Sequence, residues 1–293
     1  MLLHNQTQAI QRMNTLAKEG KDFFFIINYR ADSAYIEEFT NIDPRELLFS
    51  FPTLSNIPEA ESYSNEAVEW HTEPPTREDY EHRINLVKQR EREGDSYLAN
   101  LTCKIPIRTN LSLHDIFMRS KALYRCWMKE KFVCFSPEIF VRINREGLIS
   151  SFPMKGTIDA TRHDAEKELM ENKKEAAEHA TIVDLIRNDL SMIAEKVQVK
   201  RYRYVDHLTT NKGEILQTSS EIIGQLPVDY RQNIGTLLFR LLPAGSITGA
   251  PKPRTMEIID EAEGYERGFY TGVMGCYSKG QLDSAVMIRF IDQ

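Results

Sequence analysis

The apolar positions of this 293-residue chain recur with two different periods, which indicates both helices and strands. Residues 10–18 place apolar side chains three and four positions apart, as on one face of a helix. Residues 23–29 form a continuous aromatic and β-branched run, which predicts a strand buried on both faces. We expect residues 34–36 and 47–51 to be neighbours of this strand in the same sheet.

The next part of the chain alternates between polar connections and short periodic segments. Residues 52–75 are rich in Ser, Asn, Glu and Pro, which predicts a surface connection. A helix is expected from Thr76, with two acidic residues in its first turn, to Gly94, a typical C-terminal stop. Residues 96–107 are interpreted as a strand.

The remaining pattern predicts helices and strands without a regular βαβ alternation. The expected helices are residues 112–120, 164–170 and 173–190, and the expected strands are residues 131–135, 139–143, 148–152 and 284–291. We therefore predict an α+β fold with mixed sheets and helices in one large domain. Within it, residues 1–75 would form an N-terminal sheet-forming segment with a surface connection, and residues 76–293 the catalytic region.

Composition narrows the class of protein. The net charge is −6, which argues against nucleic acid as a partner because such proteins usually present a basic face. No apolar run is long enough to cross a membrane, and no signal peptide is visible. The four cysteines form no C-x-x-C pair, so we expect reduced thiols and a cytoplasmic protein.

One lysine lies in a setting that suits chemistry. Pro153 ends the predicted strand before it, so Lys155 is expected just past a strand end, beside a cleft. A lysine is nucleophilic only when neutral, and Phe152, Met154 and Ile158 could supply the apolar surroundings that favour this form. Taken alone, the segment is explained as well by a solvated surface lysine.

Two acidic residues form a candidate metal site. Glu175 and Glu178 are three positions apart on the predicted helix 173–190, so they project from one face and could hold Mg²⁺ with water and a substrate oxygen. The alternative is structural. Glu175 follows Asn172 by three residues, as in a capping box, and Glu178 could be a solvated helix residue.

A glycine-rich loop opens a helix near the C-terminus. Residues 245–252 read Gly-Ser-Ile-Thr-Gly-Ala-Pro-Lys, and such a loop offers free backbone N–H groups to an anion. It lacks the Gly-Lys-Ser/Thr of a nucleotide-binding P-loop, so a carboxylate or another anion is the expected contact.

These motifs together resemble the chorismate-binding enzymes, which include anthranilate, aminodeoxychorismate, isochorismate and salicylate synthases. The resemblance runs in the family's order from about residue 80 to the C-terminus. Four stretches carry it: Phe135-Ser136-Pro137-Glu138, residues 153–157, residues 174–189 and residues 245–252. Within the family, Pro-x-Lys-Gly-Thr at residues 153–157 resembles the aminodeoxychorismate synthases, because anthranilate synthases have alanine at the position of Lys155.

The resemblance implies roles for particular residues. Lys155 would be the covalent nucleophile and Glu138 the general acid in the conversion of chorismate and ammonia to 4-amino-4-deoxychorismate, a precursor of p-aminobenzoate and folate. Glu178, with help from Glu175, would hold Mg²⁺. The implied substrate contacts are Gly156, Thr157, His207, Gly245, Ser246 and Arg289. The ammonia would come from solution or from a separate glutaminase subunit, component II.

The chain also departs from the family's pattern. Leu98 stands where isochorismate-type enzymes carry a lysine base and aminodeoxychorismate enzymes often a glutamine, and Ile139 replaces an arginine. Relatives continue past residues 288–289 into a further strand, a triple-glycine turn and a second magnesium glutamate. From this we expect an unpaired apolar edge at residues 284–291 and a chain that is impaired as it stands. Anthranilate synthesis and chorismate binding without catalysis are the alternatives.

Overall fold

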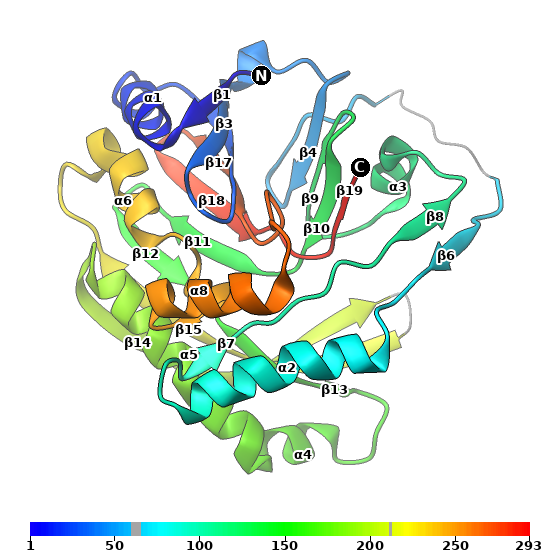
Figure 1. Cartoon of the computed structure of the whole chain (residues 1–293). Helices are drawn as coiled ribbons and strands as arrows, with labels where there is room; N and C mark the ends of the chain where they lie inside the picture. Colours follow the sequence, from blue (N-terminus) through cyan, green and yellow to red (C-terminus); the bar gives the residue numbers. More distant parts are fainter. Residues whose placement is uncertain (60–65, 211–212) are drawn as a thin grey trace.

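Two antiparallel sheets form the body of the protein in the computed structural model, which describes residues 1–59, 66–210 and 213–293 (Figure 1). The larger sheet has ten strands. Its spatial order is β1 (Leu3–Asn5), β3 (Ser33–Glu38), β2 (Phe23–Ile27), β17 (Val273–Ser278), β18 (Gln281–Val286), β11 (Ile139–Ile143), β12 (Leu148–Ser151), β15 (Gly213–Gln225) and β13 (Met154–Asp159), with β14 (Glu195–Thr210) also paired to β15.

The second sheet has five strands, and two further pairs are short. The five are, in spatial order, β19 (Phe290–Asp292), β10 (Phe132–Ser136), β9 (Tyr124–Met128), β4 (Leu47–Phe51) and β5 (Leu54–Ser55). The short pairs are β16 (Gly249–Ala250) with β7 (Leu98–Ala99), and β6 (Trp70–Thr72) with β8 (Ile107–Thr109).

Helices cover one face of the large sheet and one face of the second sheet (Figure 1). They are α1 (Gln6–Lys18), α2 (Arg77–Arg92), α3 (Leu113–Arg119), α4 (Ala165–Glu171), α5 (Lys173–Ser191), α6 (Ile234–Leu241), α7 (Gly245–Thr248) and α8 (Lys252–Glu263), with 3₁₀ turns at Phe39–Asn41 and Tyr230–Asn233. The α+β prediction is confirmed. In the part of the chain that is described, no helix is long and apolar enough to span a membrane.

Strand β2 shows how the sequence builds two cores at once. Phe23, Phe25 and Ile27 pack with α1, α5 and α6 on one face of the large sheet, whereas Phe24 and Ile26 pack between the two sheets. Because successive side chains of a strand point to opposite faces, a continuous apolar run is what this position requires. The prediction of a strand buried on both faces is therefore confirmed.

The expected sheet partner of residues 47–51 was wrong. Residues 47–51 do form a strand, but β4 pairs with β9 in the second sheet and not with β2. Its side chains also alternate between two cores, so its apolar pattern does not say which sheet it joins.

Residues 60–65, part of the predicted surface connection 52–75, lie outside the described residues, and that connection also carries β5 and β6.

The strand predicted over residues 96–107 is mostly an extended segment held by side chains. Only β7 and the start of β8 are strand. Between them, the backbone N–H of Thr102 donates to Glu263 (2.7 Å), and the guanidinium of Arg267 donates to the carbonyl of Asn100 (2.6 Å). The backbone groups of Thr102 and Asn100, which a neighbouring strand would otherwise satisfy, therefore form hydrogen bonds with the buried side chains of Glu263 and Arg267.

The unpaired apolar edge expected at residues 284–291 does not occur. The segment is divided: β18 ends at Val286, Arg289 adopts a left-handed φ of 54°, and β19 begins at Phe290. Strand β18 lies between β17 and β11, and β19 pairs with β10. Residues 284–287 are buried, whereas β19 is the edge strand of the second sheet and its Phe290 and Ile291 are partly buried.

Candidate active site

Lys155 lies inside a strand rather than just past the end of one. Pro153 ends β12, but β13 starts at once at Met154, and both strands pair with the long strand β15. The register shifts between Met154 and Thr157, so the segment around Lys155 forms an irregularity in the sheet. Thr218 of β15 donates its hydroxyl to the carbonyl of Lys155 and holds this irregular segment.

The amine of Lys155 faces helix α5. Its Nζ lies 3.4 Å from Glu178 Oε2, and its side chain is 42% exposed. The surroundings of Lys155 are therefore not apolar alone, because a carboxylate lies beside its amine. Glu178 also pairs with Lys174 on its own helix, at 3.6 Å.

Glu175 and Gly156 lie beside this ion pair. Gly156 has a φ of +87°, and a Cβ placed on it would lie 3.1 Å from Glu175 Oε2. The predicted N-cap is present, because Asn172 accepts from the backbone N–H groups of Lys174 and Glu175. The carboxylate of Glu175 itself faces β13. Helix α5 thus presents both predicted metal carboxylates to the segment that carries Lys155.

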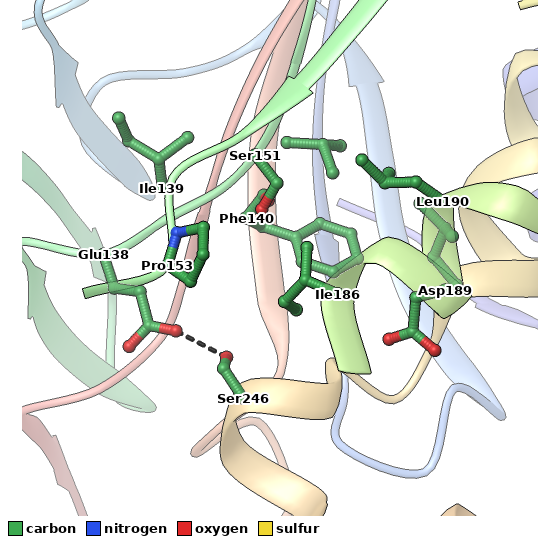
Figure 2. Close-up of a pocket in the computed structure, with 11 residues that line it drawn as sticks. Glu138, Ile139, Phe140, Ser151, Pro153, Ile186, Asp189, Leu190 and Ser246 are labelled. Carbon is green, nitrogen blue, oxygen red and sulfur yellow. Dashed lines mark hydrogen bonds between the residues drawn. The ribbon is translucent and has the colours of Figure 1, made fainter. Parts of the chain in front are cut away.

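Glu138 follows β10 and meets the glycine-rich loop. Ser246 Oγ donates a hydrogen bond to Glu138 Oε1 at 2.5 Å (Figure 2). Burial raises the pKa of the Glu138 carboxyl above its ordinary value, and the Ser246 hydrogen bond and the charge of Lys155 partly oppose this shift. A buried carboxyl with a raised pKa is suited to donate a proton near neutral pH.

A small cavity of about 20 Å³ adjoins this carboxyl, room for about one water molecule. Glu138, Ser246 and Asp189 line it together with apolar side chains, and Figure 2 shows the two carboxyls entering it from different elements. Ile139, which replaces the family's arginine, also lines the cavity and packs against the core between the sheets. The replacement therefore fits an apolar position.

Three other predicted contacts lie elsewhere or at the margin. Thr157 is exposed on β13. His207 is exposed on β14 and lines a separate hollow with Arg162, Asp164 and Lys167, which does not include Lys155. Arg289 lines a large cavity of about 880 Å³. That cavity is also lined by Tyr265, Tyr270, Arg267 and Trp70.

Two residues near the site carried no role in the sequence interpretation. Asp189 and Lys252 form a largely buried ion pair at 2.8 Å. Asp189 lies on the apolar face of α5, next to Ile186 and Leu190. A charged residue within an apolar helical stripe was the signal that could have identified it. Leu98, in β7, packs against the main core and pairs with Ala250.

Comparison with known proteins identifies the family. The family model of chorismate binding enzymes matches residues 22–293. An uncharacterised PabA-like protein of Pasteurella multocida is 44% identical over 97% of this chain and 87% of its own length. Anthranilate synthase component 1 of Acetivibrio thermocellus is 33% identical over 74% of this chain, which spans 45% of that enzyme.

The fold agrees with this relationship. MenF, the menaquinone-specific isochorismate synthase of Escherichia coli, superposes with a TM-score of 0.68 at 14% identity, covering 100% of this chain and 75% of MenF. The four motifs named from the sequence lie within the matched residues, and the structure places Lys155 beside Glu178 and within electrostatic range of Glu138. The chain belongs to the chorismate-binding enzyme family.

Proposed function

We propose that this protein is a component I-type aminodeoxychorismate synthase, which converts chorismate and ammonia to 4-amino-4-deoxychorismate and water. The observation that carries the proposal is the position of Lys155. Its amine lies 3.4 Å from Glu178, and its charge is close enough to lower the pKa of Glu138. One nucleophile, one acid and one metal-binding carboxylate therefore share a site.

In the first step the amine of Lys155, in its neutral form, bonds through Nζ to C2 of the chorismate ring. The ring double bonds shift, the C4–O bond breaks, and Glu138 gives its proton to the departing hydroxyl, which leaves as water. Ser246 holds the Glu138 carboxyl in place for this transfer through its hydrogen bond. Two successive displacements replace one difficult displacement, which is the general advantage of covalent catalysis.

In the second step ammonia adds at C4, the double bonds shift back, and the C2–N bond breaks to release Lys155. The proton lost by the added nitrogen returns to the Glu138 carboxylate, so both residues end in their starting state. No oxidant or reductant is needed. We propose that a separate glutaminase, component II, delivers the ammonia, and that ammonium salts replace it in the assay.

We propose Mg²⁺ as the cofactor, held by Glu178 and Glu175. The carboxylate donors suit this hard cation, and Glu175 faces Gly156 while Glu178 faces Lys155. The described residues include no cluster of three or more His, Cys, Asp or Glu side chains arranged to hold a metal. Substrate and water would complete the shell, as Mg²⁺ sites with one or two carboxylates require. When bound, the ion would neutralise charge on the chorismate carboxylate.

The test is incubation with chorismate, an ammonium salt and Mg²⁺, followed by chromatography of the products. Because β18 and β19 are both paired, the unpaired segment from which an impaired chain was expected is absent, and we expect aminodeoxychorismate, which a lyase converts to p-aminobenzoate. Formation of fluorescent anthranilate would instead indicate the alternative that 33% identity to an anthranilate synthase keeps open. Chorismate binding without any product would indicate a non-catalytic binder and contradict the proposal.

A further inference from the structure

A second charged pair, Asp189 with Lys252, lies near the predicted proton donor, because Asp189 lines the same cavity as Glu138. Lys252 Nζ is 2.8 Å from Asp189 Oδ2, and the two side chains are only 16% and 13% exposed. Burial raises the pKa of Asp189, and the ammonium of Lys252 opposes this rise. A buried ion pair of this kind does little for net stability but fixes the geometry of the elements that carry it.

Lys252 ties the two ends of the glycine-rich loop together. It opens α8 after the loop, and its Nζ also donates to the carbonyl of Leu241, the last residue of α6 before the loop, at 2.9 Å. One ammonium group therefore bridges α6, α8 and, through Asp189, α5. The loop between residues 242 and 251 is closed by these contacts.

Asp189 also sets the position of the loop's first glycine. A Cβ placed on Gly245 would lie 2.8 Å from Asp189 Oδ2, closer than side chains tolerate. The next residue, Ser246, is the donor to Glu138. Asp189, Ser246 and Glu138 line the same cavity of about 20 Å³, so a space of about one water molecule lies between the two carboxyls (Figure 2).

We propose that Lys252 is a positioning residue: its ion pair with Asp189 holds the loop so that Ser246 stays within hydrogen-bonding distance of Glu138. The proposal rests on the proposed function only in taking Glu138 as the proton donor. Two charged groups come near Glu138 from the packed elements, Lys155 from β13 and Asp189 from α5, and Lys252 from α8 faces Asp189.

The test follows the titration of the Glu138 carboxyl by ¹³C NMR of glutamate-labelled protein, with Glu138→Gln to assign the signal. Ser246 lowers the pKa of Glu138, so Ser246→Ala should raise its midpoint. We expect Lys252→Met to raise it as well, because the loop no longer holds Ser246. In the Ser246→Ala background, Lys252→Met should add no further shift, since the hydrogen bond is already absent.

That double substitution separates positioning from direct charge. If loss of the Lys252 charge acted on Glu138 through space, the shift would persist in the Ser246→Ala background, and the proposal would be overturned. An unchanged midpoint in folded Lys252→Met protein would overturn it too. If Lys252→Met does not fold, Asp189→Asn combined with Lys252→Met leaves a neutral buried pair. The Glu138 midpoint is then measured in that variant, with and without Ser246→Ala.

Turnover gives a second readout. Lys252→Met should lower kcat by about 10²-fold, as a displacement of the acid near 1 Å would, with little change in KM. Lys252→Arg, which keeps the charge, should restore most of it, and the exposed control Lys88→Met should change neither value. Absence of turnover in the wild-type protein would contradict the proposed function, whereas the NMR titration would still decide the role of Lys252.

Discussion

Lys155 and Glu178 face each other across the gap between a sheet strand and a helix, with 3.4 Å between the amine nitrogen and a carboxylate oxygen. The contact places the predicted nucleophile and the predicted metal ligand in one site although 23 positions separate them in the chain. Both side chains are partly exposed, at 42% and 37%, so a substrate can reach either of them.

We predict that Lys155→Ala abolishes product formation. A methyl group cannot form the bond to the ring. Mass spectrometry of wild-type protein with chorismate, without ammonia, should find an adduct on the Lys155 peptide. Lys167→Ala, which changes an exposed lysine on α4, is the matched control and should keep the adduct. An adduct that persists in Lys155→Ala would assign the nucleophile to another residue.

Glu138→Gln should lower kcat by about 10²- to 10⁴-fold with little change in chorismate affinity, because one positioned proton donor contributes about this much. The substitution keeps the shape and an acceptor oxygen for Ser246. Steady-state kinetics separate kcat from KM. Near wild-type turnover would remove Glu138 from the mechanism.

The same substitution should change the pH dependence of stability. Burial raises the folded-state pKa of Glu138, so the native protein binds more protons than the unfolded chain between the two pKa values. Stability therefore falls as pH rises through this window. Glu138→Gln removes the effect, and its stability relative to wild type should increase as pH rises above about 4, the ordinary pKa of a glutamate carboxyl. Urea unfolding at several pH values measures this, and a constant difference would contradict it.

Much of the fold and part of the site could be predicted from the sequence. Helix α2 was expected from Thr76 to Gly94 because its cap and its stop are local signals, and the structure has it at Arg77–Arg92. Strand β2 was predicted because a continuous apolar run indicates a strand buried on both faces, whichever strands pair with it. Sheet membership was not predictable for β4, since its pattern fits either sheet.

The site shows the same division. The Pro-x-Lys-Gly-Thr motif named Lys155, but its pairing with Glu178 depends on the register shift in β13 and on how α5 crosses the sheet. The extended segment after β7 could not be distinguished from a strand, because the groups that satisfy its backbone, Glu263 and Arg267, lie about 160 residues away in the sequence.

Removing the buried charge of Arg267 should strongly lower the stability of the folded protein. Its guanidinium and the Glu263 carboxylate are each 1% exposed and lie 2.5 Å apart. Removing one partner leaves an unpaired buried charge, so Arg267→Met should destabilise the protein by about 3–5 kcal/mol. Arg77→Met, which breaks an ion pair with Glu81 whose arginine is 90% exposed, should cost less than about 1 kcal/mol. Chemical denaturation measures the loss of stability in each variant, and equal losses would contradict the burial of the Arg267–Glu263 pair.

Gly156→Ala and Gly94→Ala form a matched pair that compares a glycine packed against Glu175, a proposed metal ligand, with a glycine in open space. Both glycines have a positive φ, +87° and +82°, so alanine carries a similar backbone cost of about 1–2 kcal/mol at each. Nothing lies within 4 Å of a Cβ on Gly94, whereas a Cβ on Gly156 would lie 3.1 Å from Glu175 Oε2 and 3.3 Å from Thr218 Oγ1. We expect Gly156→Ala to weaken Mg²⁺ binding, measured by calorimetry with chorismate present, because the added methyl displaces Glu175. Gly94→Ala should leave it unchanged. Equal binding by both variants would remove Glu175 from the metal site and leave Glu178 as the carboxylate that the Lys155 segment faces.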